Sequence, residues 1–594
     1  MRIVRVAFLL AVVSAGAQAA AASLIDVAQS RPRGETAHHL LDESTDARLQ
    51  ADLETLVRQE VARRALPAAA TPLEAPHFTN DQIAALTWWT TKTGSAPLLL
   101  ADLLTQTIAS SLQIGVFSEL PAIRQTSVDE AEGRYAPEVF AEGRYAYRNE
   151  PTTSLFQTRG AARLNEKDTQ IEFGIRDRLR TGAQVSLSER FTNLDTNFID
   201  YIPPQQARSR TVLGITQPLL REGGTAYNSA ITRIARLETD VAASEFARQA
   251  ESHLLEVVRS YWTLYLARAA LAQQLRASAE VDALVDRIDK RASFDGLALQ
   301  ASRARAVAAE RHAGLIRSES AVRNAESRLR ALVNAPGMSG PIAAGEEPVT
   351  VFHPVGPRSL AETALTLRPE IKQGLIAYRS ALLREGMAAN ERLPQLDLIG
   401  EVSINGRRGN FDFGGGFSDA TKAPVSYSGG LRLSIPLGDD ERKARYARRR
   451  IESNQSALQL RATVETVLLE ATVAENEYRV AYAEMMRRAE ALQFARDDQR
   501  VLGERYASGI GANGGGSAGV TDGLVYLDRL LDSQTRVADI ERELVEAQAT
   551  FQVAGAAVAR ARGSLLADLG FAVTASRGGD GLPRFALTPR ATVR

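Results

Sequence analysis

Two very long segments of the chain carry apolar residues at helical spacing and contain almost no Gly or Pro. They span residues 228–293 and 441–508. Each segment predicts a helix on the order of 100 Å long, at ~1.5 Å per residue. The second has apolar positions at alternating intervals of three and four, a heptad-like pattern that predicts helix–helix packing: Val464, Leu468, Ala471, Ala474, Tyr478, Ala481, Met485, Ala489, Leu492 and Ala495.

A Gly-containing turn follows each long segment, and a second helical segment follows each turn. The returning segments span roughly residues 297–334 and 524–566. We therefore predict two long antiparallel helical hairpins, one in each half of the chain. The two halves have the same order of elements, although few residues are identical between them, so the sequence predicts an internal two-fold repeat.

Segments in which apolar and polar residues alternate with a period of two precede each long helix. They span residues 138–147 and 211–219 in the first half, and 395–405 and 425–437 in the second. Such alternation predicts strands with one apolar face and one polar face, as the wall of a water-filled membrane barrel requires. A half-exposed strand of a soluble protein has the same pattern. The expected apolar face carries Val139, Ala141, Tyr145, Tyr147, Leu213, Ile215, Leu219, Leu396, Leu398, Gly400, Val402, Ile404, Val425, Tyr427, Leu431, Leu433, Ile435 and Leu437.

Two further segments lie between these strands. Residues 169–191 predict an additional hairpin that turns at Thr181-Gly182 and has no counterpart in the second half, and its role stays open. Residues 405–424 are rich in Gly and Asp, which predicts an extracellular loop.

Four strands cannot close a barrel by themselves. An open strand edge in lipid leaves backbone groups unpaired, at several kcal/mol each. If the strands cross a membrane, the chain must therefore oligomerise. Three chains of four strands would give twelve strands, an even number within the known range.

The N-terminus has the pattern of a secretory signal. Arg2 and Arg5 precede the apolar run 6–13, and Ala17-Gln18-Ala19 forms a small-residue cleavage site. We expect residues 1–19 to be removed during export.

Composition excludes several classes of function. The 71 basic and 71 acidic residues balance, which argues against a nucleic-acid binder. The absence of cysteine excludes thiolate metal sites and cysteine nucleophiles. No motif for a nucleophile, metal or nucleotide site is present, so we expect no catalytic residue, no metal and no cofactor.

Several motifs resemble those of the TolC family of outer-membrane efflux proteins. Leu367-Arg368-Pro369-Glu370-Ile371, followed by Ala377 and Leu393-Pro394-Gln395-Leu396, is similar to that family's passage from helix to barrel strand. The run from Thr216 to Gly224, followed by Asn228, resembles its passage from strand to long helix, and Ile435-Pro436-Leu437 is the second-half counterpart. The resemblance covers residues 96–566, in the right order twice.

The resemblance implies a homotrimer with a twelve-stranded barrel in the outer membrane, four strands per chain, continuous with a long α-helical coiled-coil barrel in the periplasm. Its implied function is passive conduction of substrates in a tripartite efflux or type I secretion system. The implied partners are a periplasmic adaptor protein, an inner-membrane pump and outer-membrane lipid. A periplasmic coiled-coil structural or adaptor protein is the alternative, and the exported substrate and pump type stay open.

The resemblance also implies two sets of site residues. In the family a basic residue shortly before a Gly marks each helical tip, where the adaptor docks. Here these pairs are Arg291 with Gly296 and Arg505 with Gly509, and the second tip carries a Gly-rich insertion at 511–519. A Gly at a helix end is also an ordinary C-cap.

The second set is a periplasmic aperture. Asp532 falls where the family carries a carboxylate, with Asp522 and Asp528 nearby, while the usual partner position carries Arg529. The matching first-half stretch carries Arg303 and Arg305. Three copies would form a charged ring that selects ions, or the charges form local ion pairs on a solvated helix face. Both readings, and the net charge of a ring, stay open.

The chain is thus expected to comprise a signal peptide (1–19), an N-terminal periplasmic extension (20–95), a first repeat (96–337), a linker (338–357), a second repeat (358–568) and a C-terminal tail (569–594). The extension includes an expected amphipathic helix at 51–64 and the pair Trp88-Trp89, for which a packing contact is favoured over a place in a membrane girdle. The Gly- and Pro-bearing tail is expected to be poorly ordered.

Overall fold

The computed structural model describes residues 40–41, 44–67, 73, 76, 78, 89, 97–295, 298–409, 412–507 and 517–589. The chain forms two compact units. The first comprises residues 1–56, 123–241 and 374–460, and the second comprises residues 57–122, 242–373 and 461–594. Each unit therefore takes segments from both halves of the chain. Signal residues 1–19 lie outside the described part.

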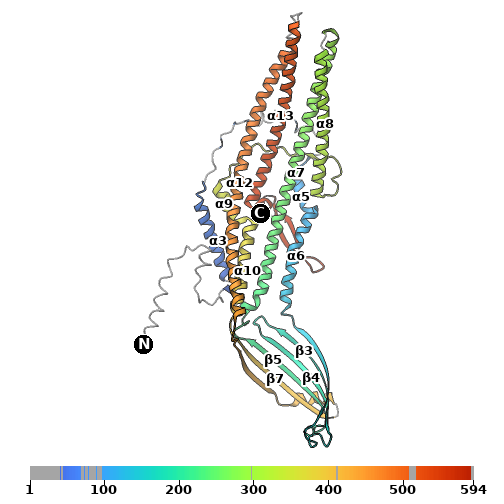
Figure 1. The fold of residues 1–594 in the computed structure, drawn as a ribbon, viewed down its shortest axis with the longest axis vertical. Helices are drawn as coiled ribbons and strands as arrows, with labels where there is room; N and C mark the ends of the chain where they lie inside the picture. The colour runs from blue at the N-terminus through green and yellow to red at the C-terminus, as the bar shows by residue number, and fades with distance from the viewer. Residues whose placement is uncertain are drawn as a thin grey trace, which may run out of the picture. The chain divides into compact units, whose positions relative to one another are not determined.

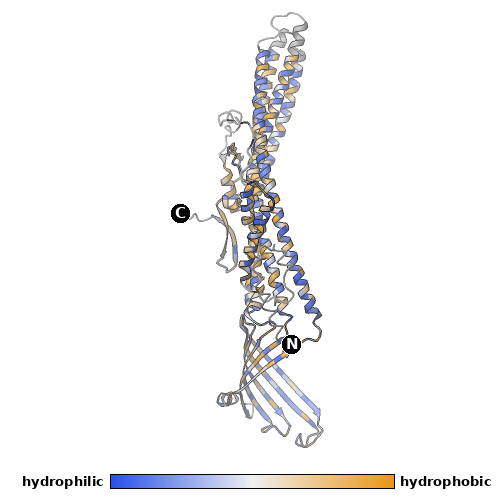
Figure 2. Cartoon of the chain, turned by 90° about the vertical axis from the view of Figure 1, so that its left-hand side faces the viewer, coloured by the Kyte–Doolittle hydropathy of each residue, from blue (hydrophilic) through white to orange (hydrophobic). Residues whose placement is uncertain are grey.

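The first unit contains an antiparallel sheet with the strand order β2-β3-β4-β5-β7-β8 (Figure 1). Its strands are β2 (Glu138–Pro151), β3 (Arg163–Arg178), β4 (Gln184–Thr196), β5 (Gln205–Pro218), β7 (Gln395–Gly409) and β8 (Ser426–Ser434). The four strands expected from alternation are all present. Hydrophobic and hydrophilic residues alternate along these strands (Figure 2).

The expected count of four strands in the sheet was wrong, because the sheet has six. The additional hairpin is β3 and β4, and it lies between β2 and β5 in the same sheet. It turns where predicted, with the Leu179 N–H donating to the Ala183 carbonyl at 2.8 Å. Local alternation of apolar and polar residues shows that a strand exists, but the neighbours of that strand depend on long-range pairing. The predicted number of barrel strands omitted this hairpin because the sequence alone does not show which strands it pairs with.

The four long helical segments are confirmed, with boundaries that differ by a few residues. They are α7 (Thr225–Asp295), α8 (Ala298–Val333), α12 (Asp440–Ala507) and α13 (Ser517–Arg562). Helix α13 begins inside the Gly-rich insertion, at Ser517, while residues 511–516 lie outside the described part. Within the described residues, no helix combines the length and apolar character needed to cross a bilayer.

Shorter elements complete the chain. The remaining helices are α3 (Ser44–Arg63), α5 (Leu100–Ser110), α6 (Leu112–Gly133), α9 (Pro357–Leu367), α10 (Pro369–Asn390), α11 (Phe413–Lys422) and α14 (Leu565–Asp568). Strand β1 (Pro97–Leu98) pairs in parallel with β6 (Ala343–Ala344). Helix α3 confirms the amphipathic helix expected in the N-terminal extension.

The main core of the second unit forms where the heptad-like pattern predicts it. Ala481, Met485 and Leu492 of α12 belong to this core, and Val464 and Leu468 of the same helix are also buried. The Tyr478 ring stacks on that of Phe551, with centroids 5.0 Å apart. Small residues on these faces let the helices approach closely, and large aromatic rings fill the remaining space.

Trp89 belongs to the same core. It is 5% exposed, and its indole N–H donates to the Tyr265 hydroxyl at 3.2 Å. The packing interpretation is therefore confirmed for Trp89, while Trp88 lies outside the described residues.

The C-terminal tail was expected to be poorly ordered, and this prediction was wrong. Residues 571–589 form a hairpin of β9 (Phe571–Arg577) and β10 (Pro583–Pro589). In its turn the Asp580 carboxylate accepts from the Leu582 N–H at 3.2 Å and pairs with Arg584 at 2.9 Å. Leu587 is buried in the main core of the second unit. The Gly and Pro residues form a turn and strand ends here, so they do not indicate disorder.

We expect Leu587→Ala to release this hairpin. Leu587 is 9% exposed, so removing its side chain should cost about 2 kcal/mol or more. Limited trypsin digestion should then cleave after Arg577 and Arg584 faster than in the unmodified protein. Leu582→Ala is the control, because Leu582 lies in the same hairpin and is 57% exposed. Equal protection of both variants would show that the core does not hold the hairpin.

Candidate functional site

One face of the six-stranded sheet carries mainly polar and charged side chains. The strand register places oppositely charged residues beside one another on this face. Arg176 pairs with Glu138 at 2.9 Å and Arg190 with Glu172 at 2.7 Å. Arg210 of β5 reaches Glu401 of β7 at 2.5 Å. The ion pairs therefore cross from strand to strand, and this face suits contact with water.

The opposite face is apolar and exposed. The register brings the expected apolar residues that lie within β2, β5, β7 and β8 to this face, so the predicted alternation is confirmed for them. Leu219, Val425, Ile435 and Leu437 lie outside these strands. Exposed large side chains continue across the whole sheet: Val139, Tyr145, Ile171, Phe173, Ile175, Leu187, Leu213, Ile215, Leu398, Val402, Tyr427, Leu431 and Leu433. An exposed apolar surface of this breadth indicates contact with lipid or protein.

Helix α11 covers part of the apolar face. A Cβ placed on Gly406 of β7 would lie 2.0 Å from the Gly416 carbonyl oxygen, so the strand and the helix are in direct contact there. The Asp412 carboxylate caps this helix by accepting from the Gly415 N–H at 2.8 Å. The segment expected to be only a loop thus contains a helix, because the cap and the packing offset the poor helix propensity of its glycines.

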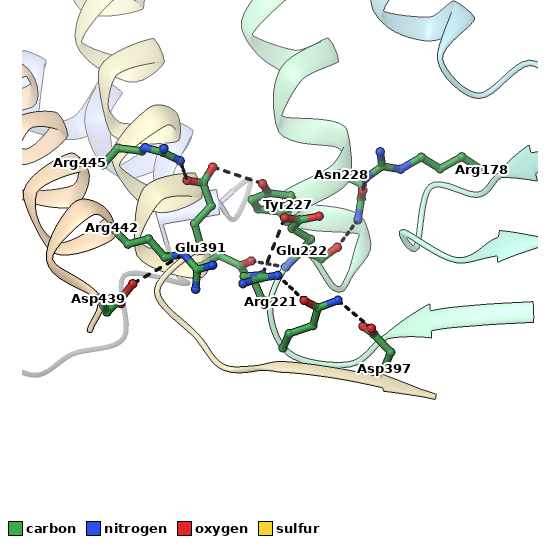
Figure 3. Close-up of polar contacts among 12 residues, drawn as sticks. Arg178, Arg221, Glu222, Tyr227, Asn228, Glu391, Asp397, Asp439, Arg442 and Arg445 are labelled. Carbon is green, nitrogen blue, oxygen red and sulfur yellow. Dashed lines mark hydrogen bonds and ion pairs between the residues drawn. The ribbon is translucent and has the colours of Figure 1, made fainter. Parts of the chain in front are cut away.

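A tight turn joins the sheet to α7 (Figure 3). Glu222 and Gly224 have φ angles of 61° and 89°. The Asn228 side-chain amide donates to the carbonyl oxygens of both residues at 2.9 Å, and it accepts from Arg178 of β3 at 3.2 Å. Asn228 was part of the motif for this passage, and the structure gives it a physical role: it holds the turn closed.

Polar side chains from α7, from α12 and from the residue that follows α10 meet at the same junction (Figure 3). Glu391, just after α10, accepts from Tyr227 of α7 at 3.4 Å and pairs with Arg445 of α12 at 3.0 Å. Burial, together with the nearby carboxylates of Glu391 and Glu222, raises the pKa of the Tyr227 hydroxyl. The hydroxyl therefore stays protonated as a donor. Sequence reasoning missed these three residues, because they are far apart in the chain and belong to no motif.

The expected docking tips lie at the edge of the described part of the chain. Arg291 is in the C-terminal part of α7, and Arg505 is in the last turn of α12. Gly296 and Gly509 lie outside the described residues, as do the turns that contain them. The described helix ends therefore bracket both predicted turns.

The expected aperture residues lie on α8 and α13. Arg303 pairs with Asp528 at 2.7 Å, and Arg305 pairs with Asp289 of α7 at 2.9 Å. Arg529 and Asp532 are exposed on α13. Asp522 is also on α13, but its side chain lies outside the described part. Within the described residues, no group of three or more acidic or His side chains is arranged to hold a metal ion.

Helices α7, α8 and α13 share a small core next to these ion pairs. Leu284 and Ile288 of α7, Ala304 of α8 and Leu527 and Leu531 of α13 are buried together. The Arg303–Asp528 pair thus lies beside a packed contact, and the rigid helices fix its geometry.

Comparison with solved structures places this fold among outer-membrane channels. The outer-membrane channel OprN aligns over 84% of this chain and 96% of its own, with a TM-score of 0.55 and 15% identity. The MtrE outer-membrane channel of Neisseria gonorrhoeae, in its open state, aligns over 84% and 96%, with a TM-score of 0.55 and 13% identity. The CmeC outer-membrane channel of Campylobacter jejuni aligns over 84% and 95%, with a TM-score of 0.55 and 11% identity. No protein-family model and no curated protein sequence matches the chain.

The chain therefore has the TolC-like fold, with long coiled helices and antiparallel strands. This confirms the fold that the sequence resemblance predicted. At 11–15% identity this likeness concerns the fold.

We expect Leu433→Arg to harm assembly more than Ser434→Arg. Leu433 is on the apolar face near the end of β8, where an arginine that faces lipid close to the interface costs up to about 1 kcal/mol in each copy, while the adjacent Ser434 is on the polar face. The yield of each variant in the membrane fraction, relative to the unmodified protein, measures the difference. Equal yields would show that the apolar face does not contact lipid.

We expect Gly182→Ala to destabilise the junction more than Gly160→Ala. Both glycines have φ near +88°, so an alanine at either position is strained by about 1–2 kcal/mol. At Gly182 the new Cβ would also lie 2.7 Å from the Asn228 amide nitrogen and 2.8 Å from the Glu222 carbonyl oxygen, whereas at Gly160 it meets open space. The midpoint of thermal unfolding in detergent should fall further for Gly182→Ala. An equal fall in both would mean that only backbone conformation matters.

Proposed function

We propose that this protein is an outer-membrane channel that conducts substrates passively from the periplasm to the exterior. The observation that carries the proposal is the sheet itself. It has one continuous polar face crossed by ion pairs and one broad apolar face, and it joins long helical hairpins as in channels of the same fold. The protein is a conduit and performs no catalysis.

The proposed assembly is a homotrimer in the outer membrane that extends into the periplasm. Within the described part of the chain, the sheet ends at β2 on one side and β8 on the other. Six strands that alternate in direction give these two end strands opposite directions. Strand β8 of one copy therefore pairs antiparallel with β2 of the next, and the ring closes without an open edge.

The proposed partners are a periplasmic adaptor protein and an inner-membrane pump, as parts of a tripartite efflux or type I secretion system. The adaptor docks at the two helical tips marked by Arg291 with Gly296 and Arg505 with Gly509. The residues on α8 and α13 line the aperture. The Arg303–Asp528 pair favours neutralised charges there over a purely acidic ring.

A periplasmic coiled-coil protein is the alternative function considered from the sequence. It accounts for the helical hairpins but leaves the exposed apolar face of the sheet without a role. Purified protein reconstituted into a planar lipid bilayer separates the two functions. Discrete ion currents support a channel, and a protein that inserts without conducting contradicts it.

We expect Arg505→Glu to weaken adaptor binding without reducing the amount of channel in the membrane. Arg505 is exposed in the last turn of α12, in the unit that does not contain the sheet strands. A surface substitution usually alters folding stability by only about ±0.5 kcal/mol. The substitution reverses a charge at this docking tip in each of three copies. In-cell cross-linking to the adaptor should therefore fall by much more than a change of about 0.5 kcal/mol in folding stability would cause.

The matched control is Arg487→Glu. Arg487 is an exposed arginine of the same helix, 62% exposed, and ~27 Å from Arg505 along the helix axis. It should leave both the amount of channel and adaptor cross-linking unchanged. Full cross-linking by Arg505→Glu would show that docking does not depend on this tip, and the tip at Arg291 would be tested next.

A further inference from the structure

We propose that the transmembrane barrel of this channel has eighteen strands, because the β3–β4 hairpin is part of the barrel wall. The inference rests on the proposed trimeric channel. Six strands in each of three chains give eighteen, whereas the twelve strands expected from the resemblance count four per chain. The exit is then wider than that of a twelve-stranded barrel.

Backbone pairing is the first support. Strand β3 pairs with β2 along the whole of β2, from Glu138 opposite Arg176 to Pro151 opposite Arg163. Strand β4 pairs with β5 from Gln184 opposite Thr216 to Asp195 opposite Gln205. A hairpin outside the wall would leave β2 and β5 to pair with each other. Here the hairpin occupies the pairing edges of both strands.

The two faces of the hairpin are the second support. Ile171, Phe173 and Ile175 of β3 continue the apolar face beside β2, and Leu187 of β4 continues it beside Leu213 of β5. On the polar face, Glu172 and Arg190 form an ion pair within the hairpin, and Arg176 pairs with Glu138 of β2. The hairpin therefore has the two-faced character of the four expected strands, as a barrel strand between water and lipid requires.

Glu189 interrupts the apolar run in the middle of β4, and its surroundings explain why it is tolerated. The other charged residues on this face of the hairpin lie nearer the strand ends, with Lys167 opposite Asp195 and Asp177 opposite Val185. It lies opposite Thr211 of β5 and is 8% exposed. Its carboxylate accepts hydrogen bonds from Ser209, at 2.5 Å, and from Thr211. The rings of Phe173 and Phe191 lie 5.9 Å apart on the same face. A carboxylate satisfied by two hydroxyls beside aromatic rings costs far less in lipid than a bare one.

The hairpin turn is the third support, because it is fixed to the junction between strand and helix. Gly182 packs against Glu222 and Asn228, Thr181 donates to the Gln217 side chain at 3.0 Å, and Arg178 donates to Asn228. The hairpin is thus anchored at the helix end of the sheet, where the neighbouring strands are also anchored.

Insertion of a hairpin also preserves the conditions for closure. Two added strands leave β2 and β5 antiparallel and leave the end strands of the sheet with opposite directions. Because barrel diameter grows roughly linearly with strand number, eighteen strands give about 1.5 times the width of twelve. Barrels of this size hold an aqueous channel. The exit therefore admits hydrophilic polymers that a twelve-stranded exit excludes.

Electron cryomicroscopy of the unmodified protein in lipid nanodiscs tests the inference directly. We expect a trimeric barrel in which eighteen strands are counted, with β3 and β4 between β2 and β5 of each copy. A trimer with twelve strands in the wall and the hairpin outside would overturn the inference and leave the channel function intact. A protein that forms no trimer would contradict the proposed function itself.

Polymer exclusion tests the width in function. Poly(ethylene glycol) of increasing size is added only on the extracellular side of a planar bilayer, so that the barrel mouth determines which polymers lower the conductance. We expect deletion of residues 163–196, which removes β3 and β4, to shift the cut-off to smaller polymers. Deletion of residues 154–160, in the loop between β2 and β3, is the control and should keep the original cut-off. An unchanged cut-off in a conducting strand-deletion trimer would contradict the inference. If that deletion fails to assemble, the strand count of the unmodified protein decides.

Discussion

Hydrogen bonding of the backbone at the two ends of the sheet is the constraint on which the rest of this structure depends. Strands β2 and β8 each pair with one neighbour within the described chain, so each presents a row of N–H and C=O groups along its other side. Water satisfies such groups at the surface of a soluble protein. In hydrocarbon each unpaired group costs several kcal/mol, a penalty that no side-chain contact offsets along a whole strand. A sheet whose broad face is apolar must therefore find its missing strands in other copies of the chain.

The need to pair the backbone in hydrocarbon also accounts for the difference between the two faces of the sheet. Alternation along each strand separates the side chains, and the register aligns them across strands, so that ion pairs collect on one side and apolar groups on the other. At the junction, Asn228 closes the turn into α7, while Glu391 links Tyr227 and Arg445. These contacts connect the sheet to the starts of both long helices. In the proposed channel, the strands enter the membrane from this connected base.

Much of this arrangement was predictable from sequence, because periodicity is a local signal. The long helices, the four alternating strands and even the turn at Thr181-Gly182 follow from spacing alone. The place of the extra hairpin does not, since any alternating strand can pair with several others and only the full sheet shows which neighbours it has. Helix α11 and the C-terminal hairpin were missed for a related reason, because a Gly-rich sequence predicts a loop. In the structure the Asp412 cap stabilises α11, and burial of Leu587 stabilises the hairpin. For the expected aperture, charge patterns gave candidates, and the structure adds a partner for Arg303 and for Arg305.

Native mass spectrometry of the protein extracted from outer membranes in mild detergent tests whether identical copies close the edges of the sheet. Because these edges need partner strands, we predict a single species that contains three chains and resists dilution. A monomer that keeps its strand content, as judged by circular dichroism of the same sample, would contradict the account, because its sheet edges would be stable without a partner.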